Sequence, residues 1–122
     1  MKLADYKKLH QPKESETQTA IINYLESKGY YCQRLNAGSY KTESGYIRGV
    51  KGGTPDIMAF KRQPSMGIIR GVLQLLFFEV KRKGNKPTRI QEIKMLELAT
   101  YGAKCFIATS VEDVIEALRN TV

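Results

Sequence analysis

Three segments of the chain repeat apolar residues at the three- and four-residue spacing of an amphipathic helix. The predicted helices cover residues 15–28, the segment between Thr88 and Gly102, and residues 110–118. Each begins at a polar residue that can cap its first turn: Ser15 with Gln18, Thr88 with Gln91, and Ser110.

Four short runs of β-favouring residues predict strands around these helices. They lie within residues 30–36, 54–61, 68–83 and 103–110. Residues 37–53 are rich in Gly, Ser, Thr and Tyr, and we expect a long mobile loop there. The order of helix, three strands, helix, strand and helix favours an α/β fold with a mixed central sheet flanked by helices. We expect one domain, residues 15–122, after a flexible segment of residues 1–14.

The composition is that of an ordinary globular protein. The 122 residues are 42% hydrophobic, which is enough for one domain with its own core. No apolar run approaches the ~18 residues of a membrane span, and the polar N-terminal stretch does not resemble a secretory signal. We therefore expect a cytoplasmic protein in which Cys32 and Cys105 are thiols, although the sequence also allows a bridge between them. His10 is the only histidine, which argues against His-based metal or Ser-His-Asp chemistry.

Charge is distributed unevenly along the chain. The formal net charge is +8, and residues 44–91 hold ten Lys or Arg residues but only two acids, Asp56 and Glu79. A basic block of this kind suggests a polyanionic partner, most often a nucleic acid. A solvated basic surface that keeps the protein soluble is the alternative. Both acids lie in apolar segments of the block, where a cation-binding pair is expected if the partner is a phosphate backbone.

The stretch LLFFEVKRKG, residues 75–84, places charges in the most hydrophobic predicted strand. Side chains alternate along a strand, so Glu79 and Lys81 point to one face and Val80 to the other. Asp56 begins a neighbouring strand and can lie beside Glu79. Two adjacent carboxylates repel each other unless a cation lies between them. Their oxygens suit Mg²⁺ or Mn²⁺, with the Val80 carbonyl as a third ligand, and Lys81 can orient water or stabilise phosphate charge.

Each of these features also has an ordinary structural interpretation. Glu79 and Lys81 can form an ion pair on an edge strand, and Asp56 can belong to a turn after two glycines. Glu16 is favoured in the first turn of a helix by the macrodipole, and Gln91 can serve only its capping box. The joint occurrence of the two strand-borne acids in the basic block favours the functional interpretation.

Three stretches resemble the motifs of the virus-type replication-repair nuclease (VRR-NUC) domains: GGTPDIMAF, FFEVKRKG and KPTRIQ. These domains belong to the PD-(D/E)XK superfamily, so the resemblance implies a restriction-endonuclease-like αβββαβ core. It implies metal binding by Asp56 and Glu79 and a catalytic role for Lys81. It also matches Gln91 to the polar residue that starts the following helix, and Glu16 to the glutamate of the first helix.

The resemblance implies a Mg²⁺-dependent DNA endonuclease without an organic cofactor, in which Mn²⁺ can substitute. Stand-alone viral and bacterial members look like homodimers that cut branched DNA such as four-way junctions, which predicts a bacterial or phage-infected cell as the setting. Flap or nicking activity, a non-catalytic DNA-binding module and a restriction-type enzyme are the alternatives.

The basic residues expected to contact backbone phosphates are Arg48, Lys51, Lys61, Arg62, Arg82, Lys83, Lys86 and Arg89. The apolar residues Ile68, Ile69, Val72 and Leu73 are candidates for the dimer interface.

Overall fold

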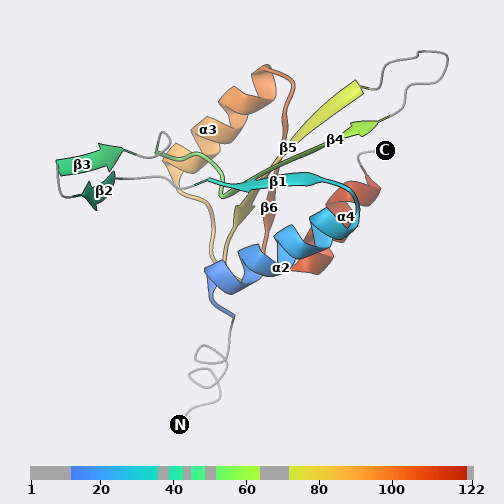
Figure 1. The fold of residues 1–122 in the computed structure, drawn as a ribbon, viewed down its shortest axis with the longest axis horizontal. Coiled ribbons are helices and arrows are strands. Elements are labelled where there is room, and N and C mark those ends of the chain that lie inside the picture. Colours follow the sequence, from blue (N-terminus) through green and yellow to red (C-terminus); the bar gives the residue numbers. More distant parts are fainter. Residues whose placement is uncertain (1–11, 36–38, 43–44, 49–51, 64–71, 121–122) are drawn as a thin grey trace, which may run out of the picture.

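The computed structural model describes residues 12–35, 39–42, 45–48, 52–63 and 72–120. Its centre is a four-stranded mixed sheet with the strand order β1-β4-β5-β6 (Figure 1). The strands are β1 (Tyr31–Arg34), β4 (Ile57–Gln63), β5 (Val72–Val80) and β6 (Lys104–Ala108). The pairs β1–β4 and β4–β5 are antiparallel, whereas β5–β6 is parallel. The parallel pair requires a crossover, and helix α3 (Arg89–Thr100) provides it.

The helices cover both faces of this sheet (Figure 1). On one face, α2 (Glu14–Ser27) and α4 (Val111–Arg119) contact each other and form the main core with the strands. That core includes Ile21, Leu25, Ile57, Leu76, Phe78, Val80 and Val114. Helix α3 lies on the other face, where the thiol of Cys105 on β6 donates to the Met95 carbonyl at 3.6 Å. The predicted α/β class and mixed sheet are therefore confirmed. No helix among the described residues is long and apolar enough to span a membrane.

Two of the three predicted helix caps are present. Thr88 Oγ1 accepts from Gln91 N at 3.2 Å, and Gln91 Oε1 accepts from Thr88 N at 2.9 Å, which completes the capping box of α3. Ser110 Oγ accepts from Asp113 N at 3.3 Å at the start of α4. The predicted cap at Ser15 is wrong, because α2 begins one residue earlier and makes no side-chain cap. Acidic residues in the first turn of α2 interact favourably with the helix dipole instead.

The expectation of a loop over residues 37–53 is wrong for two segments. Strands β2 (Ser39–Thr42) and β3 (Gly45–Arg48) form a separate antiparallel two-stranded sheet. The register pairs Tyr40 with Ile47 and Lys41 with Tyr46. These β-favouring residues are interspersed with Gly, Ser and Thr, so the polar composition of the segment concealed its strands.

The strand boundaries also differ from those predicted. Strand β4 extends to Gln63, two residues beyond the predicted strand of residues 54–61, and β5 begins at Val72, inside the predicted range of residues 68–83. Pairing between β4 and β5 explains the extension, because Gln63 is opposite Val72 in the ladder. Residues 1–11, 36–38, 43–44, 49–51, 64–71 and 121–122 lie outside the described residues, and the predicted flexible segment of residues 1–14 falls largely among them.

Candidate active site

Asp56 and Glu79 meet at one end of the central sheet. Asp56 directly precedes β4, and Glu79 is the penultimate residue of β5. The register pairs Ile57 with Phe78, so one further step along the antiparallel ladder brings Asp56 opposite Glu79. Opposite residues in such a ladder have Cβ atoms about 5 Å apart. The sheet therefore brings together the two acids of the basic block.

Two hydrogen bonds hold Asp56 in place. Its Oδ2 accepts from the backbone N–H of Val80 at 2.7 Å, and its backbone carbonyl accepts from Leu35 N at 2.7 Å. The first bond joins the start of β4 to the end of β5, and the second joins it to the residue after β1. Because the Val80 side chain is completely buried in the core, the Asp56 carboxylate is attached to a fixed point.

Glu79 is buried, and its two carboxylate oxygens have different surroundings. The residue is 2% exposed. Its Oε1 accepts from Gln91 Nε2 at 3.1 Å and lies 3.6 Å from Lys81 Nζ. Its Oε2 is buried and has no hydrogen-bond partner among the described residues. The structure thus brings Lys81 and Gln91 to the Asp56–Glu79 pair, and one carboxylate oxygen is left for a further partner.

The environment of the pair favours protonation. Burial and, after it, the charge of Asp56 raise the pKa of Glu79 to about 8, against the opposing charge of Lys81. Burial also raises the pKa of Asp56, against the hydrogen bond from Val80. Two buried carboxylates cannot both ionise easily without a nearby positive charge. The pair therefore needs either protons or a cation.

The donor set fits a hard divalent cation. Two carboxylates supply oxygen ligands, and the unpartnered Oε2 of Glu79 is an acceptor that a cation can occupy. No group of three His, Cys, Asp or Glu side chains within the described ranges is arranged to hold a metal ion. A cation held here would therefore take its other ligands from water, substrate or backbone, which suits Mg²⁺ because it retains several waters.

A glutamate other than the predicted one influences the pair. The charge of Glu14 contributes to the raised pKa of Asp56, so the start of α2 acts electrostatically on the site. Glu16 is exposed and lines a hollow with Thr109 and Ser110 near the start of α4. Residues two apart on a helix point about 200° apart, so the two glutamates cannot share one direction. The resemblance pointed to Glu16, and only the placement of α2 on the sheet distinguishes it from Glu14.

Four of the predicted DNA-contacting residues follow β5, the strand that carries Glu79. Arg82 and Lys83 line a hollow of about 420 Å³ that also includes Thr109 at the end of β6. Lys86 is exposed in the segment that leads to α3. The Arg89 side chain, at the start of α3, is 79% exposed and lies 3.6 Å from Glu92. These residues form a basic segment that leads from the end of β5 into α3.

Lys61, another predicted DNA contact, is not brought to the pair. The ammonium of Lys61, farther along β4, lies 4.7 Å from the centre of the Tyr30 ring and donates to the Lys28 carbonyl at 3.5 Å. It therefore contacts the C-terminal end of α2. The side chains of Arg48 and Arg62, and the whole of Lys51, lie outside the described residues.

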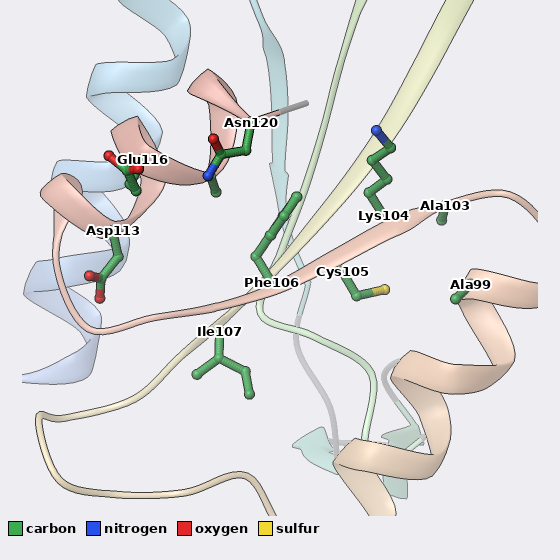
Figure 2. A pocket seen from close by; sticks show the side chains of 10 residues that line it. Ala99, Ala103, Lys104, Cys105, Phe106, Ile107, Asp113, Glu116 and Asn120 are labelled. Carbon is green, nitrogen blue, oxygen red and sulfur yellow. The ribbon is translucent and has the colours of Figure 1, made fainter. Parts of the chain in front are cut away.

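A larger hollow of about 680 Å³ lies away from these residues, along β6 between α3 and α4 (Figure 2). Its lining includes Lys104 and Phe106 of β6, Ala99 of α3 and Glu116 of α4. Neither Asp56 nor Glu79 lines it. The chemistry that the carboxylate pair can perform is therefore located at the end of β5, outside this hollow.

Solved structures share this α/β architecture. A structure described as a VRR_NUC domain has a TM-score of 0.60 at 24% sequence identity, over 89% of this chain and 97% of that chain. A second, described as a VRR_NUC domain protein, has a TM-score of 0.54 at 21% identity, over 89% of this chain and 87% of that chain. The chain therefore has the fold of these VRR-NUC domain structures, as its motifs implied. No protein-family model and no curated protein matches the sequence.

The raised pKa of Glu79 predicts how stability depends on pH. The pKa is about 8 in the folded protein, against an ordinary value of 4.5. The contribution of Glu79 to the free energy of unfolding is therefore fully present below pH 4.5 and is lost as the pH rises through about 8. In metal-free protein, the melting temperature should fall between about pH 6 and pH 8.5, and Glu79→Gln should reduce that fall. Equal falls in both proteins would contradict the assignment.

Proposed function

We propose that the protein is a Mg²⁺-dependent endonuclease that hydrolyses phosphodiester bonds in DNA. The observation that carries the proposal is the buried, unpartnered Oε2 of Glu79 beside the carboxylate of Asp56. The VRR-NUC fold and the adjacent basic segment support it.

Asp56 and Glu79 are the proposed metal-holding residues, with the Val80 carbonyl as a further oxygen ligand. When bound, Mg²⁺ would polarise the scissile phosphate and lower the pKa of the attacking water, and Mn²⁺ would substitute for it. The hydrogen bond from Val80 N fixes Asp56, and the one from Gln91 Nε2 fixes Glu79. The two carboxylates are therefore held in place before substrate arrives.

Lys81 is the proposed electrostatic catalyst. Its ammonium lies 3.6 Å from Glu79 Oε1, and its side chain is only 13% exposed. A positive charge held there can orient the attacking water and stabilise the negative charge that develops on the phosphate oxygens. In the reaction, a water oxygen forms a bond to phosphorus, one P–O ester bond breaks, and the leaving oxygen takes a proton.

Arg82, Lys83, Lys86 and Arg89 are proposed to contact backbone phosphates. They lie on the segment that leads from the end of β5 to the first residue of α3. DNA bound by this segment would lie near Glu79, which is the penultimate residue of β5. Contacts to phosphates position DNA without reading its sequence. This arrangement favours an enzyme that selects DNA by structure.

A four-way junction is the proposed substrate and a homodimer the proposed working form, in a bacterial or phage-infected cell. One domain with one site cuts one strand per encounter, whereas two-fold symmetry supplies paired sites for the two cuts that a junction needs. Leu73 on β5 is 62% exposed, which supports its proposed place in the interface. Ile68 and Ile69 lie outside the described residues.

The carboxylate pair can be tested by removing one charge at a time. Asp56→Asn and Glu79→Gln should each reduce Mg²⁺-dependent cleavage by on the order of 10²–10³-fold or more, because a charged ligand is lost. DNA binding should persist or strengthen, since a negative charge next to the phosphates is removed. Cleavage and binding are measured on the same labelled DNA, with and without Mg²⁺.

The matched control for these variants is Glu97→Gln on α3. Glu97 is an exposed acid that pairs with Lys94 at 3.1 Å on the same helix. Its substitution makes the same chemical change away from the pair and should leave cleavage unchanged. Wild-type cleavage rates in either Asp56→Asn or Glu79→Gln would refute the active-site assignment.

Glu14 and Glu16 form a second matched test. Glu14 adds negative charge near Asp56, where the proposed cation would be held, so Glu14→Gln should weaken Mg²⁺ binding and reduce cleavage. Glu16 is exposed toward α4, so Glu16→Gln should leave cleavage close to wild type. Cleavage rates at a series of Mg²⁺ concentrations show whether the change acts through the metal site. The opposite ranking would restore the role that the motif resemblance gave to Glu16.

The junction and dimer proposals share one experiment. Light scattering should give a mass near twice the 13.8 kDa of the chain. Labelled four-way junction, flap and linear duplex should be cut in that order of preference, with symmetric cuts on opposite strands of the junction. A monomer that trims flaps and ignores junctions would favour the flap nuclease, and DNA binding without any cleavage would favour the non-catalytic module.

A further inference from the structure

In the turn before β4, Gly53 lies very close to Ile90, the second residue of α3. Gly53 has a φ of +83°. A Cβ added to it would lie 2.7 Å from both the Cγ2 and the carbonyl oxygen of Ile90, and 3.0 Å from the Ile90 carbonyl carbon. Real Cβ atoms essentially never approach other atoms to 2.7 Å, and two of these three atoms belong to the backbone. Only glycine therefore allows the turn and the helix to approach this closely.

This contact closes a ring of interactions around the carboxylate pair. Gly53 lies just before Asp56, whose carboxylate accepts from Val80 N at 2.7 Å. The neighbouring residue, Glu79, accepts from Gln91 Nε2 at 3.1 Å. Gln91 directly follows Ile90, which contacts Gly53. The turn, the end of β5 and the start of α3 are therefore positioned relative to one another by three contacts.

None of the residues of α3 is fully buried, and Ile90 is 64% exposed. The Gln91 side chain is engaged at both ends, because its Oε1 accepts from Thr88 N and its Nε2 donates to Glu79. A displacement of the first turn of α3 therefore moves Gln91 away from Glu79.

We propose that Gly53 is a positioning residue that sets the distance between Gln91 and Glu79. Its lack of a side chain lets α3 approach the turn, and the approach places the Gln91 amide on Glu79 Oε1. The consequence for cleavage rests on the proposed nuclease function, whereas the consequence for the Gln91–Glu79 hydrogen bond does not.

The chain offers two matched controls for Gly53→Ala. Gly29 also has a positive φ, +88°, but an added Cβ there meets nothing within 4 Å. Gly29→Ala thus reproduces the backbone strain without the contact. An added Cβ on the adjacent Gly52 also meets nothing within 4 Å, and its φ lies outside the left-handed range. Gly52→Ala thus controls for any substitution in the turn.

The first readout is the NMR signal of the Gln91 side-chain amide. In Gly53→Ala its proton shifts should move toward those of a free glutamine, because the hydrogen bond to Glu79 is lost. In Gly29→Ala and Gly52→Ala they should stay at the wild-type position. Unchanged Gln91 shifts in folded Gly53→Ala, or equal changes in all three variants, would overturn the proposal.

A wild-type measurement keeps the proposal testable if Gly53→Ala does not fold. The close approach requires a nuclear Overhauser effect between the α-protons of Gly53 and the γ2 methyl group of Ile90. Its presence supports the contact, and its absence in the wild-type protein would overturn the proposal without any variant.

The second readout is a double-mutant cycle on cleavage. Gly53→Ala and Gln91→Ala should each reduce the rate by about 10- to 100-fold, the range found for residues that orient metal ligands. The double variant should be little worse than either single variant, because both changes remove the same hydrogen bond. Independent, additive losses would overturn the proposal. A wild-type protein that does not cleave DNA would refute the proposed function, and the NMR readout would still decide the role of Gly53.

Discussion

The hydrogen bond from the backbone N–H of Val80 to the carboxylate of Asp56 is the constraint on which the site depends. It joins the ends of two antiparallel strands at 2.7 Å, and its donor belongs to a residue whose side chain is buried in the core. The bond therefore fixes the Asp56 carboxylate, at the end of the sheet, relative to the hydrophobic core. Since Glu79 precedes Val80 in the same strand, fixing Asp56 also fixes its position relative to the second acid. Burial of two like charges costs several kcal/mol unless they are compensated, so this geometry favours protons or a cation.

Alternation along the strands predicted most of the carboxylate cluster. The same-face placement of Glu79 and Lys81 follows from the two-residue period of a strand, and the structure places their charged atoms 3.6 Å apart. The capping box of Thr88 and Gln91 predicted the start of α3, because its residues are close in sequence and their hydrogen bonds are local. Local patterns of this kind identify the fold class, the strand that carries Glu79 and the helix that carries Gln91.

Other features depend on contacts between distant segments, which local patterns do not reveal. The choice between Glu14 and Glu16 depends on which face of α2 is turned to the sheet. The helix is only weakly amphipathic, so its sequence did not identify that face. The contact of Gly53 with Ile90 joins a turn to a helix far along the chain. The hairpin of β2 and β3 was missed for a different reason. Its polar composition resembles a loop, and only the pairing of its two strands distinguishes it from one.

Helix α3 shows how a precise site can be built on a weakly packed element. A helix usually owes its position to a buried apolar face, yet no residue of α3 is fully buried, and Ile90, Ile93 and Leu96 are exposed. Its first turn is instead held by the capping box, by the bond of Gln91 to Glu79 and by the close approach of Gly53. These restraints act on the first turn of the helix, whereas Met95, farther along α3, contacts Cys105 of β6. The position of Gln91 is therefore coupled to that of the carboxylate pair through its hydrogen bond to Glu79.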